Sequence, residues 1–391
     1  MLKQIEGSRA VAECVAMCRP NVISAYPITP QTHIVEDLAM IVGQGKLDAE
    51  FINVESEFAA ASVVLGASAA GARAYSATSS QGLLLMCEVI YCIAGMRLPI
   101  VLTCANRAIS APLSIWNDQQ DSMALRDAGW IQLHAEDNQE AADLHIQAFK
   151  IAEQTSLPVM VCMDGFILTH AYEPVDIPEP KQVDNFLPPF LPKNIVDPRS
   201  PKGIGLFADP RFYLETRYIL HRAMEKCEAT IKTVSADFKK TFGRDSGGFI
   251  KTYKLEDADL VIVSMGSVVG TIKELIDQME EEGKKVGLLQ ICSYRPFPRQ
   301  EIYRALKDKM NIVVLEKSVS LGRGGILASD VRWSFPRAEK KGRNISSFIA
   351  GLGGRNIPMD DLRYMVEKVE KEPVELEFLG LKKELISEKD L

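Results

Sequence analysis

Residues 50–76, EFINVESEFAAASVVLGASAAGARAYS, contain one complete strand–helix–strand unit. The pattern predicts a strand over 50–54, a helix over 56–71 and a second strand over 72–76. The alanine and glycine of the middle segment suit a helix that packs closely against another backbone. A strand joined to the next strand through a helix is typical of a parallel sheet.

The same alternation of strands and helices extends over residues 7–170. Further apolar, β-branched segments predict strands, and segments with a period near 3.6 predict helices. The predicted strands are 21–25, 99–104 and 159–163, and the predicted helices are 32–43, 81–95 and 139–154. We therefore expect an α/β fold with a parallel sheet covered by helices on both faces.

The composition changes after residue 170, because eight prolines lie between residues 171 and 202. Proline fixes φ and has no backbone N–H, so we expect an extended linker rather than a helix or a central strand. A long helix is predicted over 211–242, and a second, smaller α/β unit begins near residue 256. Its predicted elements are 260–265, 271–282, 285–292, 299–306 and 311–316. The predicted domains are 1–170, 171–255 and 256–391.

Composition and charge exclude several classes of protein. The chain has 391 residues, of which 47% are hydrophobic and 25% charged, as in an ordinary globular protein. A net charge of −7 argues against a nucleic-acid partner. No run of about 20 apolar residues predicts a membrane span, and the first residues lack an apolar leader, so we expect a cytoplasmic protein.

Metal sites are also not expected in this chain. Its eight cysteines form no Cys-x-x-Cys pair, which argues against a zinc ribbon or a ferredoxin-type cluster. Most of them lie in apolar segments, so we expect buried, reduced thiols and a reducing, oxygen-poor setting. The five histidines show no metal-binding spacing.

Active sites of parallel α/β sheets lie at the carboxyl ends of the strands, so the segments that follow the strands are the candidates. After the first strand comes Tyr26-Pro27-Ile28-Thr29-Pro30, either a rigid turn into a helix or a turn that presents the Thr29 hydroxyl. After the second strand, Glu57 opens an apolar helix. It is either a partner of the helix dipole or a carboxylate in a dry pocket that exchanges a proton with a ligand.

Two further strands are followed by polar segments. Thr78-Ser79-Ser80-Gln81-Gly82 could cap a helix or offer N–H groups to an anion. Arg107 could bind a carboxylate through two parallel hydrogen bonds or form a surface ion pair. It precedes Trp116-Asn117-Asp118-Gln119-Gln120-Asp121, where planar and polar side chains surround one tryptophan. The phosphate-binding, dinucleotide-binding and nucleophile-elbow loops of other α/β enzymes are missing, which argues against a stand-alone dehydrogenase.

Taken together and in this order, these segments resemble the alpha subunits of the pyruvate-type enzymes in the 2-oxoacid:ferredoxin oxidoreductase family. The resemblance covers essentially the whole chain. Besides the segments above, it rests on Gly66–Ala72, Arg126–Gln132, Met163–Phe166 and Tyr294–Phe297. It implies a pyrimidine-type thiamine diphosphate domain followed by a transketolase C-terminal-like domain.

The resemblance also implies roles for individual residues. The glutamate matching Glu57 hydrogen-bonds the aminopyrimidine ring of the cofactor and activates its nucleophilic carbon. The residues matching Thr29 and Arg107 lie at the carboxylate and carbonyl of the 2-oxoacid. The expected cofactor residues are Tyr26, Pro27, Ile28, Glu57, Ser80 and Gln81. The expected substrate-pocket residues are Thr29, Arg107, Trp116, Asn117, Asp118 and Gln119.

The resemblance further implies a hetero-oligomer of this chain with beta, gamma and delta-type subunits. This chain lacks the Gly-Asp-Gly and asparagine set that holds Mg²⁺ on the diphosphate, and it lacks cysteines for [4Fe-4S] clusters. Partner subunits would supply both, with ferredoxin as electron acceptor and coenzyme A as acyl acceptor. Trp116 and Gln119 stand where histidine is common in relatives. Pyruvate is the expected substrate, and oxalate, 2-oxobutyrate, a branched oxoacid and a non-catalytic scaffold role stay open.

Overall fold

The computed structural model describes residues 1–193, 195–201, 203–336 and 342–389. The chain forms two compact units. Unit 1 comprises Met1–Ile250 and Cys292–Pro298, and unit 2 comprises Lys251–Ile291 and Arg299–Leu391. This division differs from the three segments expected from the sequence. The residues that follow the first sheet belong to unit 1, because the long helix among them buries apolar side chains there.

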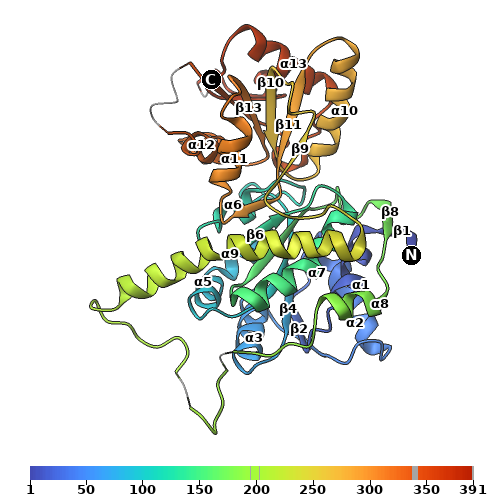
Figure 1. Ribbon diagram of the computed structural model, residues 1–391, viewed down its shortest axis with the longest axis vertical. Coiled ribbons are helices and arrows are strands. Elements are labelled where there is room, and N and C mark those ends of the chain that lie inside the picture. The colour runs from blue at the N-terminus through green and yellow to red at the C-terminus, as the bar shows by residue number, and fades with distance from the viewer. Residues whose placement is uncertain (194, 202, 337–341, 390–391) are drawn as a thin grey trace. The chain divides into compact units, whose positions relative to one another are not determined.

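Unit 1 is built on a seven-stranded sheet with the order β12-β6-β7-β5-β4-β2-β3 (Figure 1). All of its neighbouring strands pair in parallel except β12, which is antiparallel to β6. The strands are β2 Val22–Ala25, β3 Glu50–Asn53, β4 Ala74–Thr78, β5 Val101–Asn106, β6 Ile131–His134, β7 Val159–Asp164 and β12 Ser293–Arg295. The predicted parallel α/β architecture is therefore confirmed.

The helices of unit 1 cover this sheet. Helix α7 packs on β5 and β7 and is buried over most of its length, while α3 packs on β2 and β4. The small residues Ala60, Ala61 and Ala69 of α3 are buried, whereas an added Cβ at Gly66 would meet nothing within 4 Å. The helices are α1 Gly7–Met17, α2 Thr32–Gly43, α3 Glu57–Ala69, α4 Ser80–Leu85, α5 Cys87–Gly95, α6 Gln120–Ala124 and α7 Asn138–Thr155.

The predicted elements differ from the observed ones mainly at their ends. Helix α2 has the predicted bounds, whereas β4 and β5 each begin and end two residues later than predicted. The single helix predicted over 81–95 is two helices, α4 and α5. Strand β6 was not predicted, because its four residues alternate polar Gln132 and His134 with apolar residues although all four are buried.

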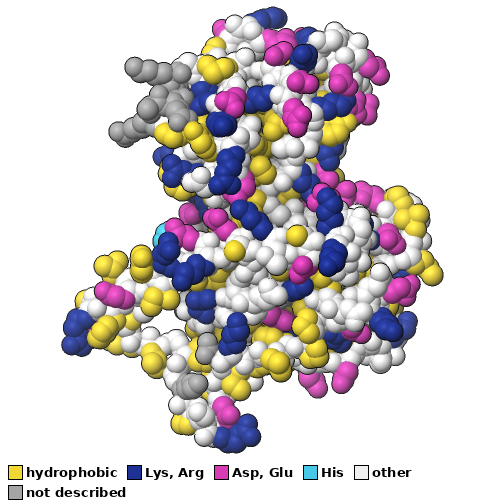
Figure 2. Space-filling view, viewed as in Figure 1, with side chains coloured by type: hydrophobic (Ala, Val, Ile, Leu, Met, Phe, Trp, Pro, Cys, Tyr) yellow, Lys and Arg dark blue, Asp and Glu magenta, His cyan; other side chains and the backbone are white. Residues whose placement is uncertain are grey.

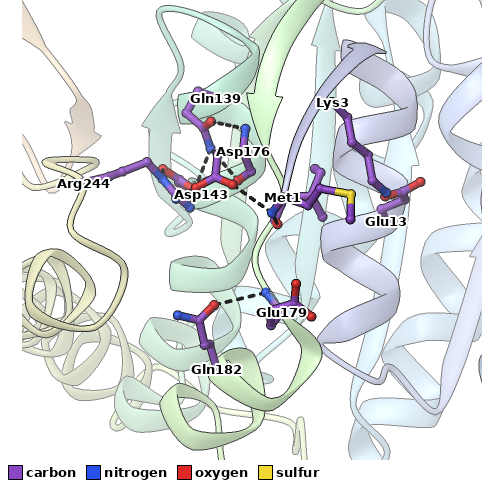
Figure 3. Close-up of polar contacts among 10 residues, drawn as sticks. Met1, Lys3, Glu13, Gln139, Asp143, Asp176, Glu179, Gln182 and Arg244 are labelled. Carbon is purple, nitrogen blue, oxygen red and sulfur yellow. Dashed lines mark hydrogen bonds and ion pairs between the residues drawn. The ribbon is translucent and has the colours of Figure 1, made fainter.

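The proline-rich segment contains more regular structure than expected, so that prediction was wrong in part. Strand β8 (Tyr172–Asp176) pairs antiparallel with β1 (Leu2–Glu6), and α8 spans Pro180–Phe186. Pro180 is the first residue of α8, where its N–H would have no helical partner anyway. Around this two-stranded ribbon, Arg244 pairs with Asp143 at 2.7 Å and with Asp176 at 2.9 Å (Figure 3).

Helix α9 (Tyr213–Phe242) has two different halves. Its C-terminal half buries Ile231, Val234 and Phe238 in unit 1. Its N-terminal end projects from the unit and exposes apolar side chains, among them Leu214 and Tyr218 (Figures 1 and 2).

Unit 2 contains a six-stranded sheet with the order β15-β14-β13-β10-β11-β9 and a core of its own. The strands are β9 Ile250–Tyr253, β10 Leu260–Ser264, β11 Val286–Ile291, β13 Asn311–Glu316, β14 Asn344–Ile349 and β15 Glu377–Phe378. The helices are α10 Val268–Glu281, α11 Arg299–Leu306, α12 Ile326–Trp333 and α13 Met359–Lys371. Strand β14 was not predicted, because polar residues interrupt its apolar pattern.

Two expectations from composition can be compared with the structure. None of the helices in the described ranges has the length and apolarity needed to cross a membrane. All eight cysteines are free, and six of them are buried; Cys87 is half-buried and Cys92 is exposed.

Candidate functional site

The candidate site lies at the carboxyl edge of the unit 1 sheet. Strands β5, β4 and β2 are neighbours there, and each is followed by one of the polar segments singled out from the sequence. The chain therefore brings the segments after residues 25, 78 and 106 to one edge.

The turn after β2 is held by a glutamine that the sequence analysis missed. Gln31 is fully buried, and its Nε2 lies 2.9 Å from the Tyr26 carbonyl oxygen and 3.1 Å from the carbonyl oxygen of Ala77 in β4. Tyr26, Pro27 and Thr29 are exposed, and Ile28 is half-buried. The turn is thus fixed to the sheet while its outer residues stay open. No pattern marks such a side chain, because its partners are backbone atoms distant in the sequence.

Glu57 is buried without a partner. It is the first residue of α3, only 7% exposed, and its carboxylate accepts no hydrogen bond from the described part of the chain. The Ser56 hydroxyl already caps this helix, accepting from the Ala59 N–H at 3.2 Å. A Cβ added at Gly82 would lie 2.7 Å from Glu57 Oε1 and 2.6 Å from Thr78 Oγ1. Only glycine at position 82 therefore leaves room for the carboxylate.

The segment after β4 contains a group of buried polar atoms without partners. Thr78 Oγ1, Ser79 Oγ and Gln81 Nε2 make no hydrogen bond to the described residues. The Ser80 hydroxyl, by contrast, lies between Gln81 Oε1 and the Ala108 carbonyl oxygen. Buried polar atoms are normally paired, so this group indicates a place where a polar ligand binds.

Arg107 follows β5 and is 6% exposed. Its Nη1 donates to the Thr29 carbonyl oxygen at 2.8 Å, and its Nε donates to the Ser114 carbonyl oxygen at 3.0 Å. Burial lowers the pKa of Arg107, and the nearby Asp121 carboxylate opposes this shift. These contacts place the guanidinium beside the turn after β2. The described residues form no ion pair with Arg107, so the alternative raised by the sequence, a surface ion pair, is not found among them.

Four residues of the following loop were predicted to line the substrate pocket, and the structure divides them. Trp116 is 53% exposed, and its ring lies 4.7 Å from that of Phe166. Asn117, Asp118 and Gln119 are buried. Asn117 Nδ2 donates to the Asn106 carbonyl oxygen at 3.1 Å, and Gln119 Nε2 donates to Asp164 at 3.2 Å. The Asp118 carboxylate accepts from the Gln120 backbone and side chain.

Comparison with known proteins identifies the family. A family model described as pyruvate flavodoxin/ferredoxin oxidoreductase, thiamine diphosphate-binding, matches residues 13–236. The chain belongs to this family. A second model, pyruvate:ferredoxin oxidoreductase core domain II, matches residues 258–362. The resemblance inferred from the sequence is thereby confirmed, and the chain is a subunit of an oxidoreductase.

Similar proteins cover nearly the whole chain. Pyruvate synthase subunit PorA of Methanosarcina barkeri is 48% identical over 98% of this chain and 97% of its own length. The PorA subunit of Methanocaldococcus jannaschii is 49% identical over 95% of both chains. Ketoisovalerate oxidoreductase subunit VorA of Pyrococcus abyssi is 42% identical over 94% of this chain and 93% of its own.

Solved structures support the fold. A 2-oxoglutarate:ferredoxin oxidoreductase from Magnetococcus marinus has a TM-score of 0.71 at 20% identity. The match covers 94% of this chain and 65% of that longer chain. A split-gene transketolase has a TM-score of 0.54 at 13% identity and is matched over 94% of this chain.

The residues at this edge fit the cofactor of the family. Thiamine diphosphate carries an aminopyrimidine ring whose nitrogens donate and accept hydrogen bonds. The unpartnered Glu57 carboxylate and the unpartnered atoms of Thr78, Ser79 and Gln81 supply acceptors and donors for such a ring. Among the described residues, Thr78, Ser79 and Gln81 have no ion pair or hydrogen bond with a cationic side chain, so these residues fit the ring rather than the diphosphate.

Proposed function

We propose that this chain is the alpha subunit of a 2-oxoacid:ferredoxin oxidoreductase that decarboxylates pyruvate oxidatively. The acyl group passes to coenzyme A and two electrons pass singly to ferredoxin, in a reversible reaction. The observation that carries this proposal is the buried Glu57 carboxylate against Gly82, unpartnered among the described residues, at the same sheet edge as the buried Arg107.

The proposed roles follow from the positions of the side chains. Thiamine diphosphate, when bound, supplies the nucleophilic carbon and the electron sink. Glu57 holds a proton at the pyrimidine ring, and its low exposure keeps water from competing for that proton. Arg107 donates to the oxoacid carboxylate from Nη2, which has no acceptor among the described residues, and Thr29 orients the oxoacid. Tyr26, Pro27, Ile28, Ser80 and Gln81 surround the cofactor ring.

Partner subunits complete the enzyme in this proposal. Beta, gamma and delta-type subunits hold the diphosphate with its Mg²⁺, the [4Fe-4S] clusters and the coenzyme A site. Support comes from the sequence, which has no cluster-type cysteine set. The similarity to subunits of pyruvate synthases supports the same arrangement. We infer that the complex works in the cytoplasm, where the free cysteines stay reduced.

Pyruvate is favoured over larger oxoacids by the loop beside Arg107. The half-exposed Trp116 ring, tilted by 43° against that of Phe166, is a bulky wall that suits a methyl-sized side chain. A branched 2-oxoacid is the second candidate, because a ketoisovalerate oxidoreductase subunit is 42% identical. Oxalate is disfavoured, because its second carboxylate calls for another cation and Thr29 is neutral.

The test is the activity of the complex, purified anaerobically with its natural partner subunits. Viologen reduction is measured with pyruvate, 2-oxobutyrate, 3-methyl-2-oxobutanoate, 2-oxoglutarate and oxalate, each with and without coenzyme A. We expect fast, coenzyme A-dependent reduction with pyruvate. A higher kcat/KM with the branched acid would replace pyruvate by the second candidate, and no reduction with any oxoacid would reject the function.

A variant tests the role of the arginine. Arg107→Ala in the same complex removes the cation for the oxoacid carboxylate and should chiefly raise KM for pyruvate, by about tenfold or more. An effect confined to the kinetics of coenzyme A would contradict the assignment.

A further inference from the structure

Asp121 is a buried carboxylate that the proposed function leaves without a role. It lies at the start of α6, is fully buried, and receives hydrogen bonds on both oxygens. Its Oδ2 accepts from the backbone N–H of Ser80 at 2.9 Å and from that of Arg107 at 3.0 Å. One oxygen therefore joins the segment after β4 to the segment after β5.

The other oxygen fixes the carboxylate in place. Asp121 Oδ1 accepts from Asn106 Nδ2 at 2.7 Å and from the Ser122 N–H at 2.8 Å. The Cys104 thiol is a fifth donor, with its Sγ 3.6 Å from Oδ2. With five donors around it, this carboxylate has no lone pair directed at a ligand, which argues against a direct chemical role. On Oδ2 it instead accepts from the backbone N–H groups of two predicted site residues, Ser80 and Arg107.

The Ser80 backbone has particular need of such support. Its φ is +49°, a left-handed conformation that costs non-glycine residues free energy and persists only where surrounding contacts hold it. The Ser80 N–H bond to Asp121 is one of those contacts. Without it, the unpartnered polar atoms of Ser79 and Gln81 on either side would no longer have a fixed direction.

We propose that Asp121 is a positioning residue that sets the separation of the cofactor segment at Ser80 and the oxoacid-binding Arg107. The inference rests on the proposed function and adds a residue to it. Strands β4 and β5 pair in parallel up to Thr78 and Cys104. Beyond these residues, the two segments are connected by the bonds from the Ser80 and Arg107 N–H groups to Asp121, which we call the Asp121 bridge. A change at Asp121 should therefore weaken cofactor and oxoacid binding together, although Asp121 touches neither.

The experiment compares two variants of the assembled complex. Asp121→Ala removes the acceptor for both backbone N–H groups. Asp121→Asn can keep one oxygen on them and turn its Nδ2 toward Asn106, whose own Oδ1 has no partner in the described ranges and can rotate to accept. This variant loses the bond from the Ser122 N–H but keeps both bonds of the bridge. We expect the alanine variant to raise both KM for the oxoacid and Kd for thiamine diphosphate at least tenfold. The asparagine variant should stay within about threefold of the wild type, and KM for coenzyme A should not change in either.

The outcomes separate this inference from the function on which it rests. If the wild-type complex reduces viologen with no oxoacid, the function fails whatever Asp121 does. If the wild type is active and the alanine variant keeps its KM and Kd, losing only thermal stability, Asp121 is merely structural and the inference is wrong. A tenfold rise in the asparagine variant would also overturn it, because the charge and not the bridge would then matter. Should the alanine variant not assemble, Asp121→Ser, whose shorter hydroxyl cannot reach both N–H groups, is measured with the same expectation.

Discussion

Two glutamates, one in each unit, are buried against a glycine at the end of a strand or the start of a helix, yet their surroundings are opposite. Glu57 in unit 1 lies against Gly82 and accepts no hydrogen bond from the described residues. Glu316 ends β13 in unit 2 and lies against Gly325, where an added Cβ would be 2.3 Å from its Oε1. Its carboxylate accepts from the N–H groups of Ile326, Leu327 and Ala328 and from the Ser318 hydroxyl.

The difference supports a structural role for Glu316 and the role that we propose for Glu57. Glu316 satisfies the first N–H groups of α12, so its charge is used within the fold. Glu57 is the first residue of α3, but the Ser56 hydroxyl caps that helix. The Glu57 carboxylate therefore has no partner among the described residues. Position at a helix start therefore does not decide the role; the hydrogen-bond partners do.

Among changes to the residues that surround the two glutamates, we expect the largest effect from matched substitutions at the glycines, Gly82 and Gly325. Gly82→Ala should push the Glu57 carboxylate aside, because the clashing atoms belong to side chains that can rotate. We expect turnover of the complex to fall about 10²-fold, as a displacement of about 1 Å can cause, with little loss of thermal stability. Gly325→Ala should do the reverse, lowering the unfolding temperature while KM and kcat of the surviving complex stay unchanged. Equal effects of both changes on turnover would break the comparison.

A smaller effect is expected from removing the charge of the structural glutamate. Glu316→Gln places an amide NH₂ against N–H donors and should destabilise unit 2 by about 1–3 kcal/mol. Hydrogen exchange of the Ile326, Leu327 and Ala328 amides measures this loss locally. Unchanged protection of these amides would show that the helix start does not depend on the carboxylate.

An effect of similar size concerns pH and Asp121, a buried carboxylate with partners on both oxygens. Burial raises the pKa of Asp121 to about 7, although hydrogen bonds from Asn106, Ser80 and Arg107 oppose the shift. Between about pH 4 and 7 the folded chain then keeps a proton that the unfolded chain has lost, and the neutral form of Asp121 accepts fewer of the N–H bonds than the carboxylate does. The contribution of Asp121 to the free energy of unfolding should therefore fall as pH rises, by at most about 1.4 kcal/mol per pH unit.

The Asp121→Asn variant provides the reference for this measurement. Unfolding of the wild type and the variant is compared at pH 5, 6 and 7, and the wild type should lose stability relative to the variant with rising pH. Of the neighbouring titratable groups, Asp118 raises the pKa of Asp121, and the Asp121 charge raises the pKa values of Arg107, Cys104 and His134. The difference between the two proteins therefore reports the titration of Asp121 together with its effect on these neighbours. Parallel curves would mean that Asp121 is already ionised at pH 5.

Local patterns in the sequence predicted the frame of the site but not the contacts that complete it. The alternation around residues 50–76 predicted the parallel sheet, and the ends of its strands predicted Glu57, the Thr78–Gly82 segment and Arg107. Gln31 and Asp121 were not predicted as site residues, because their partners are backbone groups brought close only by folding. Strand β6 was missed for a related reason, since its polar residues are buried by neighbours that no local pattern reveals.

The most direct test of the central claim is the turnover of the complete complex carrying Glu57→Gln, with Glu316→Gln as the matched control. Viologen reduction with pyruvate is measured at saturating thiamine diphosphate, after equal assembly of both variants has been established. Our account predicts that Glu57→Gln lowers kcat by about 10²–10⁴-fold, because the group that exchanges the proton is lost. Glu316→Gln should keep kcat near that of the wild type. Unchanged turnover in the assembled Glu57→Gln complex would contradict the account and support a scaffold role for this chain.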